Sequence, residues 1–207
     1  MQGYRHFFWD FDGTLYDTYQ RMLKALTKSM EELGIGQSPV DIRLLSEMTL
    51  RQACILLAGE ERADALYARF FVHAEEEGAE SMRPFPGCEE ALRWVMDRGG
   101  VNYLYTHRNF TALDALKRDG LIGLFHDFIT YEAGFPDKPA PDALRFMTSQ
   151  HGLNPSECVM IGDRLIDVQA GHNAGMAGVL FDPLGYFPNV SADFRFTKLT
   201  DITRELI

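Results

Sequence analysis

Two acidic residues interrupt an apolar run near the start of the chain. Asp10 and Asp12 lie in the stretch FFWDFDGTLYDT at residues 7–18. Burying a carboxylate without a partner is strongly unfavourable, and a buried acid is usually compensated by a cation or by hydrogen-bond donors. Two acids at this position therefore predict a compensated polar site at the end of a buried strand.

Other polar loops follow or separate further apolar segments. THRN at 106–109 follows VNYLY at 101–105, GDRLID at 162–167 follows CVMI at 158–161, and FPDKPAPD at 135–142 lies between them. These loops together offer carboxylates, one hydroxyl and one ammonium, from Asp10, Asp12, Thr106, Lys138, Asp163 and Asp167. Such a set is typical of a divalent metal beside a phosphate group.

The chemistry of these groups suggests a role for each. Mg²⁺ prefers hard oxygen ligands and keeps several waters. Asp10 and Asp163 can supply carboxylates, and a backbone carbonyl near Asp12 can supply another oxygen. Thr106 can donate to a phosphoryl oxygen, and Lys138 can neutralise the charge that develops there.

Three further residues are predicted to contact the substrate from these loops. Gly13 permits a backbone turn where N–H groups would face a phosphate, and Thr14 follows it in the same motif. His107 follows the loop hydroxyl directly and is a candidate contact. A role in stabilising the turn is the alternative for His107 and for Arg108.

Short apolar segments alternate with helical patterns over most of the chain. The expected strands are 4–9, 101–105, 158–161 and 178–181, and the expected helices are 87–99, 111–121 and 141–153. This alternation predicts an α/β fold with a doubly wound parallel sheet. Ligands of such sheets bind beyond the carboxyl ends of the strands, where the polar loops lie.

Residues 17–83 break the alternation, because three helical segments follow one another without a strand. These are 19–34, 41–59 and 61–78, followed by a linker with Pro84, Pro86 and Gly87. We therefore expect a discontinuous core of 1–16 and 84–207 with an inserted helical cap domain at 17–83. The alternative is that these helices cover one face of the sheet.

Bulk composition narrows the class of protein. The 207 residues carry a net charge of −10, which does not favour a groove for nucleic acid. Three widely separated cysteines predict neither a disulfide framework nor a zinc site. No apolar run reaches about 18 residues and no signal peptide is visible, so a cytoplasmic protein without a membrane span is expected.

Four motifs in this order resemble the haloacid dehalogenase-like hydrolase superfamily. They are DFDGT at 10–14, Thr106 of YTHR, Lys138 of DKPAPD and GDRLID at 162–167. PFPGCEEAL and AGHNAGM are similar to segments of phosphoglycolate-phosphatase-like members that carry a helical cap. The resemblance implies a Rossmann-like core with that cap.

The resemblance also implies roles for the motif residues. Asp10 would attack phosphorus and form an aspartyl-phosphate, and Asp12 would act as general acid and then general base. Thr106 and Lys138 would hold the phosphoryl group. The implied Mg²⁺ site is drawn from Asp10, Asp12, Asp163 and Asp167.

Members of the superfamily often place substrate-reading residues on the cap. Arg51, beside Thr49 in SEMTLRQA, is the candidate contact here, with an exposed helix arginine as the alternative.

The function that follows is a Mg²⁺-dependent phosphatase acting on a small phosphorylated metabolite. A phosphomutase or another phosphotransferase is the alternative within the superfamily, and a non-catalytic binding or regulatory protein is the alternative outside it. Neither the substrate nor the choice between monomer and dimer follows from the sequence.

Overall fold

A computed structural model describes residues 3–36, 40–41, 44–45, 48–76, 81–187 and 189–207. The chain folds into two compact units. The core unit comprises Met1–Tyr16 and Pro84–Ile207, and the helical unit comprises Asp17–Arg83.

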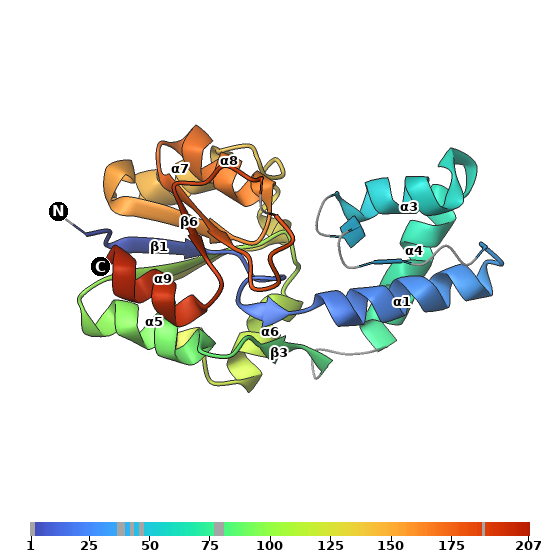
Figure 1. The fold of residues 1–207 in the computed structure, drawn as a ribbon, viewed down its shortest axis with the longest axis horizontal. Coiled ribbons are helices and arrows are strands. Elements are labelled where there is room, and N and C mark those ends of the chain that lie inside the picture. The colour runs from blue at the N-terminus through green and yellow to red at the C-terminus, as the bar shows by residue number, and fades with distance from the viewer. Residues whose placement is uncertain (1–2, 37–39, 42–43, 46–47, 77–80, 188) are drawn as a thin grey trace. The chain divides into compact units, whose positions relative to one another are not determined.

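The core unit contains a parallel sheet of six strands in the order β5-β4-β1-β6-β7-β8. Figure 1 labels its two central strands, β1 and β6. The strands are β1 His6–Trp9, β4 Val101–Tyr105, β5 Asp127–Ile129, β6 Cys158–Gly162, β7 Ala177–Phe181 and β8 Phe194–Phe196. The predicted α/β class and parallel sheet are confirmed.

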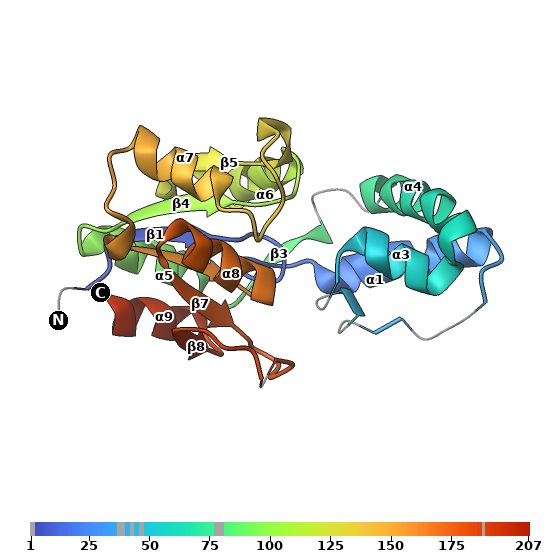
Figure 2. The ribbon, with the colours of Figure 1, turned by 90° about the horizontal axis from the view of Figure 1, so that it is seen from above.

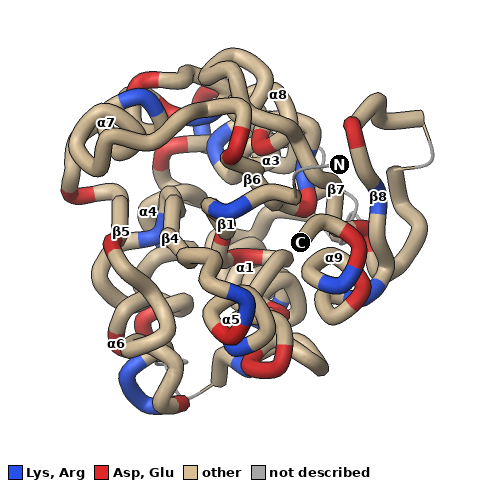
Figure 3. Tube along the Cα trace, turned by 90° about the vertical axis from the view of Figure 1, so that its left-hand side faces the viewer, with Lys and Arg blue, Asp and Glu red and all other residues tan. Residues whose placement is uncertain are grey.

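Helices cover both faces of this sheet, as a doubly wound fold requires. Helices α5 Cys88–Asp97, α6 Thr111–Arg118 and α9 Leu199–Leu206 lie on one face. Helices α7 Asp142–Gln150 and α8 Leu165–Ala174 lie on the other, as the view along the sheet in Figure 3 shows.

Strand β1 is central and positions the first acidic loop. Phe7, Phe8 and Trp9 are fully buried, because helices cover both faces of the sheet. Trp9 lies opposite Leu104 of β4 and Ile161 of β6. The residues that follow β1 therefore emerge beside the ends of both neighbouring strands.

The strands β5 and β8 at the edges of the sheet were not predicted. Each has three residues and is only partly buried, so it is too short to give a periodic signal. Short 3-10 helices complete the core unit at Ile122–Leu124, Tyr131–Ala133 and Pro155–Glu157.

The helical unit is built from α1 Tyr19–Glu32, α3 Leu50–Ala58 and α4 Glu60–Glu76. Helix α4 packs against both α1 and α3 (Figure 2). Apolar residues from all three helices form a core of their own, including Leu26, Met30, Ala53, Leu66 and Phe70.

The predicted helix over 41–59 is not continuous: residues 44–45 are helical, but a separate helix begins at Leu50. Helix α3 begins at Leu50, because Thr49 caps it: the Thr49 side chain accepts from the Gln52 N–H, and the Gln52 side chain accepts from the Thr49 N–H. Residues 42–43 and 46–47 of the predicted helix lie outside the described residues.

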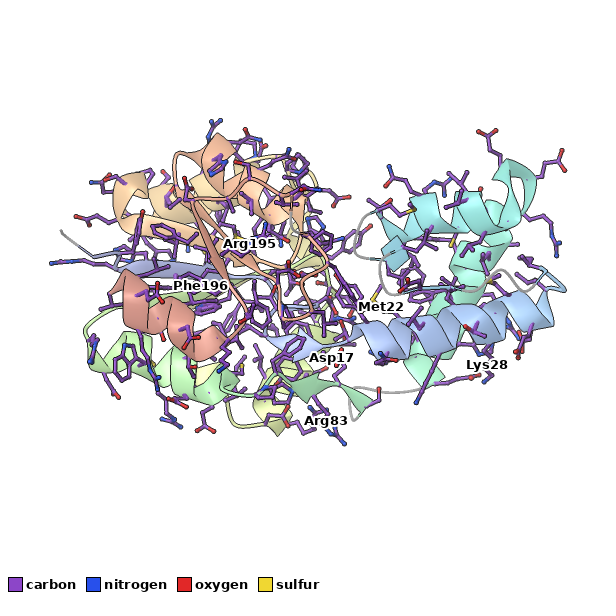
Figure 4. All side chains as sticks on the ribbon, viewed as in Figure 1. Asp17, Met22, Lys28, Arg83, Arg195 and Phe196 are labelled. Atoms are coloured by element: carbon purple, nitrogen blue, oxygen red, sulfur yellow. The ribbon has the colours of Figure 1, made fainter. Side chains whose placement is uncertain are left out.

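The chain passes between the units through a small sheet that the sequence did not predict. Strand β2 Tyr16–Asp17 pairs with strand β3 Arg83–Pro84, and Figure 4 labels Asp17 and Arg83 on these neighbouring strands. The Phe85 N–H also donates to the Leu15 carbonyl at 2.8 Å. The proline-rich linker is thus tied to the segment that leaves the core.

Among the described residues, no helix has both the length and the apolar character needed to cross a membrane.

Candidate active site

Lys138 occupies the centre of the polar loops at the carboxyl edge of the sheet. Its Nζ donates to Asp10 Oδ1 at 2.8 Å, to Asp167 Oδ1 at 2.8 Å and to the Tyr105 carbonyl at 3.1 Å. All three side chains of this ion triad are buried. The structure thus brings together residues from three loops that lie far apart in the sequence.

The two acids of the triad differ in the direction of their pKa shifts. Burial raises the pKa of Asp10 to about 6, although the Lys138 ammonium acts in the opposite direction. Burial also acts on Asp167, but Lys138 and Arg164 together lower the pKa of that carboxyl. Burial disfavours the Lys138 cation, yet its two carboxylate partners raise its pKa, so Lys138 is charged at neutral pH.

The same region offers oxygen ligands for a metal ion. Carboxylate oxygens of Asp10, Asp163 and Asp167 lie within 4.8 Å of one another, and all three residues are buried. Asp10 Oδ2 is itself buried, and no described residue donates a hydrogen bond to it. A cluster of hard oxygen donors with one unsatisfied carboxylate oxygen fits a cation such as Mg²⁺.

Asp12 lies outside this carboxylate cluster and pairs with Arg108 instead. Arg108 Nε donates to Asp12 Oδ1 at 2.9 Å and to Oδ2 at 3.0 Å, and Nη2 donates to Oδ1 at 2.5 Å. Asp12 remains partly exposed, in contrast to the buried Asp10. Sequence reasoning did not find this pair, because no spacing rule links residues 12 and 108.

Thr106 follows β4 and is held from two sides. Its N–H donates to the Ile129 carbonyl at 2.9 Å, and its Oγ1 accepts from the Arg108 N–H at 3.0 Å. Oγ1 accepts here and donates no hydrogen bond within the described residues, so its own proton remains for donation to another group.

His107 contacts the lysine loop. Its Nε2 accepts a hydrogen bond from the Lys138 backbone N–H at 2.9 Å, which places the ring proton on Nδ1. Burial, with the nearby Lys138 charge, lowers the pKa of His107 to about 4. The neutral ring therefore anchors the backbone of Lys138, which corresponds to the turn-stabilising alternative.

The turn after β1 differs in detail from its prediction. Gly13 has a left-handed φ of 76°, as expected for a glycine turn. Its N–H, however, donates to the Tyr16 carbonyl at 2.8 Å, so that N–H does not face a phosphate. Thr14 is buried and its Oγ1 donates to Asp163 Oδ1 at 3.3 Å, so its side chain holds the fourth motif in place.

Gly162 is a site residue that the sequence analysis did not single out. A Cβ atom there would lie 2.2 Å from the Asp167 side chain, so only glycine allows this approach. The Asp167 Oδ2 also accepts from the Arg164 N–H at 3.1 Å. The "GD" of the fourth motif carried this signal, because glycine at a strand end often marks close contact.

Arg51 lies in the helical unit, on α3. Its Nη1 pairs with Asp64 Oδ1 at 2.6 Å, and both side chains are largely exposed. Within its own unit Arg51 is thus an exposed helix arginine, the alternative considered for it.

The family model of haloacid dehalogenase-like hydrolases matches residues 7–181. This span includes every loop described above, and the chain belongs to that family. The chain is therefore a hydrolase of the haloacid dehalogenase-like type, and the family resemblance of its motifs is confirmed.

The individual relatives share less than 30% sequence identity with this chain. The chain is 29% identical over 181 residues to a phosphoglycolate phosphatase of Pseudomonas putida, and the match covers 81% of this chain and 65% of that protein, less than two thirds of its length. It is 26% identical over 200 residues to pyrophosphatase PpaX of Bacillus velezensis, covering 93% and 92% of the two chains.

Solved structures share the fold. A haloacid dehalogenase-like family hydrolase from Streptococcus pneumoniae has a TM-score of 0.85 at 20% identity, with both chains fully covered. A structure described as a predicted phosphoglycolate phosphatase from Haemophilus somnus has a TM-score of 0.83 at 18% identity, with 99% of each chain covered.

Proposed function

We propose that this protein is a Mg²⁺-dependent phosphatase that hydrolyses a small phosphorylated metabolite through an aspartyl-phosphate on Asp10. The observation that carries the proposal is the buried contact of Lys138 with Asp10, next to carboxylates that fit a divalent cation. A bound cation would supply charge that offsets the repulsion between an anionic nucleophile and an anionic substrate.

The proposed reaction has two steps. An Asp10 oxygen forms a bond to phosphorus while the ester P–O bond breaks, and Asp12 gives its proton to the leaving oxygen. Water then attacks the acyl phosphate, Asp12 takes a proton from that water, and inorganic phosphate leaves as Asp10 is restored. Thr106 and Lys138 would hold the phosphoryl oxygens in both steps.

The chain's own residues divide the ligand roles in this proposal. Asp10 and Asp163 would hold the cation, together with a backbone oxygen near Asp12, and Asp167 would orient Lys138. This division is supported by the 2.8 Å Lys138–Asp167 hydrogen bond and by the Asp12–Arg108 pair, which directs the Asp12 carboxylate away from the cluster.

The names of the relatives suggest candidate substrates. A phosphoglycolate phosphatase and a pyrophosphatase both act on small phosphate compounds, so 2-phosphoglycolate and pyrophosphate are the first compounds to test. The unit at 17–83 would serve as the cap that selects among substrates, with Arg51 as a surface position on it.

A substrate panel with matched variants tests this function. Purified protein is assayed for phosphate release from aryl and alkyl phosphates, 2-phosphoglycolate and pyrophosphate, with Mg²⁺ and with EDTA. We expect Mg²⁺-dependent release that Asp10→Asn and Asp12→Asn both abolish. Asp114→Asn is the control, because Asp114 is an exposed residue of α6 paired with Lys117.

The intermediate gives a second, independent readout. Asp12→Asn should still form a phospho-enzyme with a substrate that has a good leaving group, such as an aryl phosphate, whereas Asp10→Asn should not. Folded protein that releases no phosphate from any compound would contradict the proposal. A long-lived phospho-enzyme that transfers phosphate to a second metabolite would indicate a mutase instead.

A further inference from the structure

The positively charged guanidinium of Arg108 lies beside Asp12, the general acid of the proposed reaction. Its guanidinium binds both oxygens of Asp12 through Nε and Nη2, in a fork geometry. The guanidinium lies 5.8 Å from the centre of the Phe11 ring, and Phe11 is fully buried. The Arg108–Asp12 pair joins two loops: Asp12 lies in the loop after β1, and Arg108 lies in the loop after β4.

The pair with Asp12 does not use all donors of Arg108. A guanidinium has five N–H groups, and this contact engages the Nε edge. Within the described residues the guanidinium makes no other hydrogen bond, and 17% of the Arg108 side chain is exposed. The Nη1 group is therefore available to a ligand while Nε still holds Asp12.

The proposed reaction indicates which part of the substrate these donors would meet. The proposed function requires the Asp12 carboxyl to touch the ester oxygen of the substrate. Arg108 binds the same carboxyl, so in that reaction a group attached one or two bonds beyond the ester oxygen would lie within reach of the guanidinium. A guanidinium binds a carboxylate or phosphate oxygen pair with directional, charge-assisted hydrogen bonds.

We infer that Arg108 binds a second anionic group on the leaving side of the substrate. This inference rests on the proposed function and deepens it. The substrate class is phosphomonoesters or phosphoanhydrides whose leaving group carries a carboxylate or phosphate next to the ester or bridging oxygen. Simple alkyl phosphates of the same size lack the group that Arg108 recognises.

The wild-type protein alone provides one test. kcat/KM is measured with Mg²⁺ for 2-phosphoglycolate and for isobutyl phosphate, which has a neutral leaving group with the same arrangement of heavy atoms. Pyrophosphate forms a third arm that separates recognition of a phosphate from recognition of a carboxylate. We expect at least one of the two anionic compounds to exceed isobutyl phosphate by about 10–100-fold, the range of a charge-assisted hydrogen bond.

The compounds also differ in intrinsic reactivity. Comparing the same ratio of rates in wild type and in Arg108 variants cancels that difference. The preference is the ratio of kcat/KM for the better anionic compound to kcat/KM for isobutyl phosphate. Arg108→Gln should lower this preference by about tenfold or more, and Arg108→Lys, which keeps the charge but loses the fork, should lower it less. Arg93→Gln is the control, because Arg93 pairs with Glu89 on the exposed surface of α5.

The outcomes separate the two ideas. If Arg108 only orients Asp12, Arg108→Gln lowers all rates together and the preference stays unchanged, which overturns the inference. If wild type hydrolyses isobutyl phosphate as well as both anionic compounds, the inference also fails, while the proposed phosphatase function stands. If folded wild type hydrolyses no compound, the proposed function fails and the inference fails with it.

Discussion

At the scale of single residues, the site depends on one lysine and on the histidine that anchors it. Lys138 Nζ contacts Asp10 and Asp167, while its backbone N–H donates to His107 Nε2. The position of the ammonium is therefore set both through its side chain and through its backbone. Small displacements of such groups reduce rates strongly, because charge stabilisation depends on distance.

Substitution of His107 tests this anchoring role. His107→Gln places an amide oxygen near the position of Nε2 and can still accept the Lys138 N–H, whereas His107→Leu cannot. We expect kcat to fall by about tenfold or more in His107→Leu and to change much less in His107→Gln. Steady-state kinetics and circular dichroism check this, and equal losses in both folded variants would contradict it.

The lowered pKa of His107 also predicts how the free energy of unfolding depends on pH. Its pKa is lowered from 6.5 to about 4 by burial, so between these values the unfolded chain binds the proton more readily than the folded chain. Its contribution to stability is present above about pH 6.5 and is lost as the pH falls toward 4. Wild type should lose about 1–2 kcal/mol more than His107→Gln between pH 7 and 5 in urea unfolding. An equal pH dependence would refute this.

At the scale of elements, the end of β6 and the start of α8 must approach closely for Asp167 to reach Lys138. Gly162 makes this possible, because a Cβ there would lie 2.2 Å from Asp167. The strand-to-helix turn is therefore part of the site even though Gly162 has no reactive group.

Gly162→Ala should consequently displace Asp167 from Lys138. We expect a loss of activity of about tenfold or more together with a drop in the free energy of unfolding of at least about 1 kcal/mol. The matched control is Gly123→Ala, because no atom lies within 4 Å of a Cβ built at Gly123. Phosphatase assays and urea unfolding measure both quantities, and an active Gly162→Ala protein would show that the turn can relax.

At the scale of the whole molecule, all three clustered carboxylates belong to the core unit. A cation that binds only the folded core stabilises it by mass action, by about 2.7 kcal/mol at a hundred times its Kd. We expect Mg²⁺ to raise the thermal midpoint of the core and to leave a separate transition of the helical unit unchanged. Scanning calorimetry with Mg²⁺ or EDTA measures this.

Asp163→Asn provides the control for that measurement. The amide keeps an oxygen that can accept from Thr14 Oγ1, so the local hydrogen bond is preserved while a charged ligand is lost. The Mg²⁺-dependent shift should disappear in this variant. A shift of wild-type size would mean that the cation binds elsewhere.

The periodicity of the chain determined much of the core fold. Segments 101–105 and 158–161 are apolar and bounded by turns, and they form the strands that flank β1. The edge strands β5 and β8 were missed because three partly buried residues carry no pattern. Thr49 marked the true start of α3, but the capping signal was outweighed by apolar spacing over 41–59.

By itself, the sequence determined which residue types could form a phosphate-handling site, because acids, a hydroxyl and a lysine follow buried strands in a fixed order. Only the tertiary structure decided how these groups are paired. Arg108 binds Asp12 and His107 binds the Lys138 backbone because parallel strands bring their following loops to one edge. Those contacts join positions far apart along the chain, and no local pattern in the sequence records them.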